Sequence, residues 1–106
     1  MREATSWSRV QIPPGPLKIS MNLQDFAKKE IEKIEDVIKE IKMVDGKGKE
    51  LMELIESYFK DSKYFYGKQQ HLQAFEAAVI CWAYIDAGLH LKVFEVPEKF
   101  AKLFTV

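Results

Sequence analysis

The segment from residue 71 to about residue 90 most constrains the fold, because it is apolar around most of a helical surface. It contains nine consecutive apolar residues, Ala77 to Ile85. Its best core stripe repeats at helical spacing and comprises Phe75, Ala78, Trp82, Ile85 and Leu89. A membrane span needs about 20 such residues, so we expect no membrane partner. We predict a helix from His71 to Leu89 or Leu91, forming a central rod that two amphipathic neighbours cover.

The first neighbour is a helix that opens at Asn22. Asn is a good N-cap, and Asp25 stands where a capping box places an acid. The apolar residues that follow fall at steps of three and four and form one buried face: Leu23, Ala27, Ile31, Ile34, Val37, Ile38, Ile41 and Val44. We expect this helix to stop at 45–48, where Gly46 and Gly48 can take the left-handed conformation that ends helices.

The second neighbour is predicted from about Lys49 to Tyr66, with Gly67 ending it. Its inward residues are Leu51, Leu54, Ile55, Tyr58, Phe59 and Phe65. Loops of about four residues force neighbouring helices to be antiparallel. The fold class is therefore all-α, an up-down-up three-helix bundle over residues 21–106. After Val93, Pro97 is expected to begin a short C-terminal extension that packs back on the bundle through its apolar residues.

Residues 1–20 differ in composition from the rest of the chain. They hold both arginines and three of the four prolines, whereas residues 21–106 have thirteen lysines and no arginine. The string from Arg9 to Pro13 resembles a translated T-arm of a transfer-RNA gene. We interpret 1–20 as a misassigned start, with the natural chain beginning at Met21. The alternative is an ordinary disordered tail, which the prolines would equally produce.

Charge, cysteine and motif content restrict the function classes. Sixteen basic residues balance sixteen acids, which argues against a nucleic-acid partner because phosphate binding needs excess positive charge. A single cysteine, Cys81, cannot form an internal disulfide, so we expect a cytoplasmic protein with an inert buried thiol. Asp86 and His90 are only half of a metal site. Without a phosphate loop or catalytic motif, we expect no enzyme activity, no cofactor and no metal.

Three strings resemble a known family. They are the aromatic-rich stretch 58–65 with Gly67 after it, the stretch 74–77 (Ala-Phe-Glu-Ala), and the stretch 82–88 ending in Asp-Ala-Gly. Together they are similar to the archaeal domain-of-unknown-function family 357, over about 41–96. The resemblance implies a three-helix bundle and an archaeal source, and it brings no assigned activity. One departure is Leu91-Lys92, where the family often has Leu-Gly.

A first candidate site lies on the hairpin of the second and third predicted helices. Asp61 precedes Gly67 by six residues and Glu76 follows Gln70 by six, which places the two acids at one level of an antiparallel hairpin. With Tyr58 and Tyr64 they form a candidate acidic and tyrosine cluster for a small ligand. The plainer alternative is that these acids bond tyrosine hydroxyls or lysines at the surface.

A second candidate is an interface on the far face of the third helix. Ile80, Ala83 and Ala87 fall opposite the core stripe, with Tyr84 beside them. Small residues let another helix approach closely, so we expect the C-terminal segment or a second subunit to cover them. The preferred hypothesis is a non-enzymatic interaction module, a homodimer or a subunit of an assembly. The alternative is a small-ligand or accessory subunit that uses the acidic and tyrosine cluster.

Overall fold

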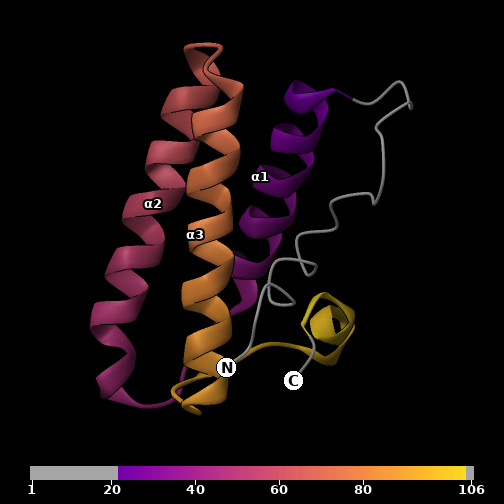
Figure 1. Cartoon of the computed structure of the whole chain (residues 1–106). Coiled ribbons are helices and arrows are strands. Elements are labelled where there is room, and N and C mark those ends of the chain that lie inside the picture. Colours follow the sequence, from indigo (N-terminus) through magenta and orange to yellow (C-terminus); the bar gives the residue numbers. More distant parts are fainter. Residues whose placement is uncertain (1–21, 105–106) are drawn as a thin grey trace, which may run out of the picture.

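The computed structural model describes residues 22–104, and the prediction for 1–20 lies outside them. Three long helices form the bundle: α1 (Leu23–Glu40), α2 (Lys49–Gly67) and α3 (His71–His90). Figure 1 shows α3 in the middle, with α2 along one side of it and α1 along the other. The all-α three-helix bundle is confirmed. Short elements complete the described chain: β1 (Lys42–Met43), η2 (Gly46–Gly48), β2 (Phe94–Glu95) and η3 (Glu98–Leu103).

The third helix is the central rod that its apolar sequence predicts. Ala78 and Ile85 are fully buried, and Trp82 is 7% exposed. Facing helices contribute Ile34 and Val37 from α1 and Ile55 and Phe59 from α2, all of them buried. By length and composition α3 also reaches the threshold for a membrane span, with a mean hydropathy of 1.2 and 44% of the stretch buried in the bundle. The core helix of a bundle passes the same test.

The first helix begins as predicted and ends earlier. Asn22 is its N-cap, and its side-chain Oδ1 accepts a hydrogen bond of 3.0 Å from the Asp25 amide. The predicted end at 45–48 is wrong, because the helix stops at Glu40 and the chain turns into strand β1. Val44 accordingly leaves the predicted apolar stripe and is 49% exposed.

The strand that ends the first helix pairs with the C-terminal segment. β1 and β2 are antiparallel, with Lys42 opposite Glu95 and Met43 opposite Phe94. The Val44 amide extends this ladder by donating to the Val93 carbonyl at 2.9 Å. Residues about 50 positions apart therefore pair at this end of the bundle. The spacing of apolar residues within α1 does not predict this pairing.

The Phe94 side chain locks the C-terminal segment to the helices. It is 2% exposed and is the largest of the fully buried side chains. A Cβ built at Gly88 of α3 would overlap the Phe94 ring, and one at Gly48 would lie 2.9 Å from it. Both glycines make room for the aromatic ring, and Gly48, at φ = −80°, does not take the left-handed conformation predicted at 45–48.

The rest of the C-terminal segment packs back on the bundle, as predicted. Phe104 is buried and meets the Trp82 ring edge-on, with 5.6 Å between centroids. Lys99 forms an ion pair of 2.7 Å with Glu40 at the end of α1. Pro97 is the N-cap of η3 rather than its first residue. The segment therefore covers the Trp82 side of α3.

Candidate functional site

The acidic and tyrosine cluster lies on the antiparallel hairpin of α2 and α3. The Ser62 hydroxyl donates to the Ala74 carbonyl at 2.7 Å, and this bond sets the register of the two helices. Asp61 and Glu76 are adjacent to this level, and both are exposed. Tyr64, also predicted in the cluster, is 58% exposed.

Tyr58, the fourth member of the cluster, turns toward α3. Its ring stacks on that of Tyr84, with 5.9 Å between centroids and 28° between planes. Within residues 22–104 no hydrogen bond or ion pair joins any two of Tyr58, Asp61, Tyr64 and Glu76. Over the same residues, no group of three or more His, Cys, Asp or Glu side chains is arranged to hold a metal ion. Asp61, Tyr64 and Glu76 therefore lie open to solvent, and no such contact within residues 22–104 joins the four side chains into a pocket.

The predicted interface strip lies on the side of α3 left open by its neighbours. Ala83 is exposed, and Ile80, Tyr84 and Ala87 are half-buried. At 3.6 residues per turn, Ile80, Ala83 and Ala87 lie roughly 100–160° around the helix from Trp82. The C-terminal segment meets the Trp82 side instead. The expectation that the C-terminal segment covers this strip is wrong. Covering of the strip by a second subunit stays a prediction.

The second helix adds to the same surface, which the sequence interpretation missed. The Tyr58–Tyr84 stack crosses between α2 and α3 beside the strip. Leu54 of α2 is 39% exposed, and Leu91 at the end of α3 is 66% exposed. We call this surface the hairpin face and define it by Leu54, Tyr58, Phe65, Ile80, Ala83, Tyr84, Ala87 and Leu91. The spacing of Leu54, Tyr58 and Phe65, at steps of four and seven, was the available signal.

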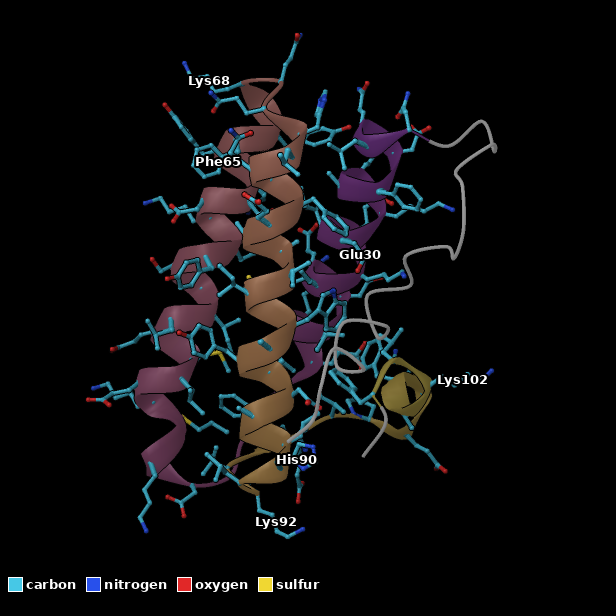
Figure 2. The ribbon with its side chains drawn as sticks, in the orientation of Figure 1. Glu30, Phe65, Lys68, His90, Lys92 and Lys102 are labelled. Carbon is cyan, nitrogen blue, oxygen red and sulfur yellow. The ribbon has the colours of Figure 1, made fainter. Side chains whose placement is uncertain are left out.

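A buried carboxylate joins α1 to α3 on the opposite side. Glu30 is 3% exposed, and its Oε1 accepts a hydrogen bond of 2.7 Å from the Trp82 indole Nε1. Lys33 approaches its Oε2 at 3.2 Å. Figure 2 shows Glu30 on the side of α1 that faces α3. Ala27, Glu30, Ile34 and Val37 follow one another at steps of three and four, so periodicity could have placed this acid inside.

The single cysteine is inert by environment, as predicted. Cys81 is fully buried, and its Sγ lies 3.5 Å from the Ile55 carbonyl. Burial, with a smaller contribution from the charge of Asp61, raises the pKa of the Cys81 thiol from 9.0 to about 12. Because the thiolate is the reactive form, this residue is a poor nucleophile at neutral pH.

A groove of about 500 Å³ opens at the C-terminal end of α3, between the helix and the C-terminal segment. Leu89, Phe94 and Phe104 are its apolar lining. The charged side chains along it are of both signs, Lys92 against Glu95 and Glu98, and His90 lies beside them. His90 Nε2 also lies 3.8 Å from the Asp86 carboxylate, one turn earlier on α3. Lining of mixed sign favours neither an anion nor a cation.

Comparison with known proteins gives one match. The model of a protein family of unknown function, DUF357, matches residues 24–94. The chain belongs to the DUF357 family. No curated protein and no solved structure matches it. The family match adds α1 to most of the stretch 41–96 on which the sequence resemblance rests, so it takes in all three long helices of the bundle.

The structure gives a physical reason for two features at the end of α3. The glycine of the Asp-Ala-Gly string is Gly88, which has no room for a side chain against Phe94. Lys92, two residues after the last residue of α3, has φ = 62°. This left-handed conformation favours glycine. Its amide bonds the Leu89 carbonyl and that of Val93 bonds the Gly88 carbonyl, the pairing that closes a helix end.

Proposed function

We propose that this DUF357 protein is a non-enzymatic protein–protein interaction module that acts through the hairpin face. The observation that supports it is the combination, on one surface, of exposed leucines at Leu54 and Leu91 with the half-buried Tyr58–Tyr84 pair. Exposed apolar residues gathered on one face, and aromatic side chains above all, are typical of protein contacts. The proposal places the protein in the cytoplasm, with no cofactor, nucleic acid or membrane as its partner.

Affinity capture with matched surface variants tests the proposal. Ala83→Arg places a long cation on the hairpin face at an exposed position, so the fold is retained. Asp36→Arg introduces the same side chain at an exposed position of α1 and serves as the control. We expect bound protein, whether a second copy or another chain, to be lost with Ala83→Arg and kept with Asp36→Arg. Equal capture by both variants would contradict the proposal.

The second candidate function is that of a small-ligand or accessory subunit using Tyr58, Asp61, Tyr64 and Glu76. The level shared by the two acids favours it, because paired carboxylates can hold a proton or a cation. A bound ligand raises the melting temperature by mass action. A shift with divalent cations that Asp61→Asn abolishes would support this function. Shifts that persist in Asp61→Asn would contradict it.

A further inference from the structure

One exposed stripe of α2 carries a pattern that is complementary to itself. Positions 50, 54, 57, 61, 64 and 68 are separated by steps of four and three and therefore share one side of the helix. All six side chains are exposed. We call them the α2 stripe: Glu50, Leu54, Ser57, Asp61, Tyr64 and Lys68. The stripe borders the hairpin face and shares Leu54 with it.

The complementarity appears when a second copy of the stripe is laid antiparallel to the first, with position 59 of both copies at the same level. Glu50 then stands opposite Lys68, Leu54 opposite Tyr64, and Ser57 opposite Asp61. These pairs are an ion pair, an apolar side chain against an aromatic ring, and a hydroxyl donor against a carboxylate. Two copies of α2 packed antiparallel across a two-fold axis bring each of these pairs to one level of the interface twice, as an isologous arrangement requires. A parallel arrangement would instead set Glu50 against Glu50 and Lys68 against Lys68.

The side chains at the top of the stripe are already held in suitable positions. Lys68 Nζ lies over the Tyr64 ring, 5.6 Å from its centroid. Tyr64 also meets the Phe65 ring edge-on at 5.7 Å. Figure 2 shows Phe65 and Lys68 near the hairpin end of α2. Because these contacts restrain Tyr64, one of the most exposed large apolar side chains of the described residues, less conformational freedom is lost on binding.

We propose that a second copy of this chain docks on the α2 stripe, beside the hairpin face, with its α2 antiparallel to the first and position 59 at the middle level of the pairing. This inference rests on the proposed function and names its partner. From position 50 to position 68 the stripe is about 27 Å long at 1.5 Å per residue. A strip of that length and one helix wide is narrow for a stable dimer, so the stable dimer also needs contacts from the neighbouring part of the hairpin face, where Tyr58 of α2 stacks on Tyr84 of α3.

Sedimentation velocity of the full chain and its charge variants tests this arrangement. Glu50→Lys and Lys68→Glu each convert two attractive contacts per dimer into repulsive ones, and we expect each to weaken self-association by about tenfold or more. Mixing the two variants restores both contacts, so the mixture is expected to form a heterodimer near the native affinity. Glu56→Lys, the same charge change at an exposed position outside the stripe, is the control and is expected to leave the dissociation constant unchanged.

Tyr64→Ala supplies a test that does not depend on charge. The side chain is 58% exposed, so its removal is expected to weaken the dimer and leave the circular dichroism and melting temperature of the dilute monomer unchanged. A chain that stays monomeric at a protein concentration of about 100 μM would overturn the inference. So would a dimer that tolerates Glu50→Lys, Lys68→Glu and Tyr64→Ala. If Ala83→Arg still abolishes capture of another protein, the interaction function stands and only the second copy is refuted.

Discussion

Replacing Gly88 with alanine tests the contact that joins the C-terminal segment to the bundle. The added methyl group would overlap the Phe94 ring, which is 2% exposed and has no free space to enter. Expelling the ring would forfeit what a Phe→Ala change costs in a core, about 3–5 kcal/mol. Alanine returns about 1 kcal/mol of helix propensity. We expect a net loss of about 2–4 kcal/mol in the free energy of unfolding, from a total of about 4–13 kcal/mol for a domain of this size.

Thermal and urea denaturation followed by circular dichroism measure this loss. At about 4–8 °C per kcal/mol, the melting temperature is expected to fall by roughly 8–30 °C. Gly67→Ala is the matched control, because nothing lies within 4 Å of a Cβ at this helical glycine. That variant is expected to be neutral or stabilised by up to about 1 kcal/mol.

A double-mutant cycle isolates the contact itself. Phe94→Ala removes the ring, so Gly88→Ala in that background is expected to be neutral or stabilising. The coupling free energy between the two positions is then about 2–4 kcal/mol. If Gly88→Ala costs the same with and without the Phe94 ring, the steric explanation of Gly88 is refuted.

Three further predictions concern single sites. Lys92→Gly relieves a left-handed residue at φ = 62° and should stabilise the protein by about 0.5–1 kcal/mol in urea melts, and a loss of stability would contradict the reading of this turn. Trp82→Phe removes the indole donor of the buried Glu30 and should cost about 2–4 kcal/mol. The same Trp82→Phe change is expected to cost less in a Glu30→Met background, where the carboxylate is absent. Strictly additive losses of stability from the two changes would argue against the Trp82–Glu30 hydrogen bond. With a pKa of about 12 against 9.0 for the unperturbed thiol, Cys81 should react with a disulfide reagent at pH 8 only as fast as the protein unfolds. Because the folded state holds this proton more tightly, the free energy of unfolding should fall as pH rises from about 9 to 12, and a Cys81→Ala variant should lack that contribution.

The helices could be predicted from sequence because their signals are local. Asn22 and Asp25 mark the start of α1, and the apolar run around Trp82 identifies the helix that must be covered on several sides. The end of α1 could not be found in this way. It depends on β1 pairing with β2, and nothing within a window around Lys42 shows that Glu95 will lie opposite it. Register between distant segments is a property of the packed chain.

The candidate site also contains residues that one helix alone predicts and residues that depend on a distant partner. The strip at Ile80, Ala83 and Ala87 follows from α3 alone, because its apolar surface exceeds what two neighbours cover. Glu30 escaped sequence analysis for a different reason. Its spacing from Ala27 and Ile34 places it on the buried face of α1, but its charge indicates a solvent-exposed position, and only the approach of Trp82 Nε1 makes burial of the carboxylate favourable. Polar groups whose partners come from another helix are therefore the least predictable members of the core.

The hairpin face and the core place different demands on α3, and the sequence of α3 meets both. Toward α2 and α1 it presents Cys81 and Trp82, whose side chains each find a polar partner on the facing helix. On its remaining side it carries the half-buried Ile80 and the exposed Ala83. An isolated three-helix domain gains no stability from the apolar atoms that stay exposed on this side. Their presence on α3, next to the exposed Leu54 of α2, is what an interaction partner on this face would require.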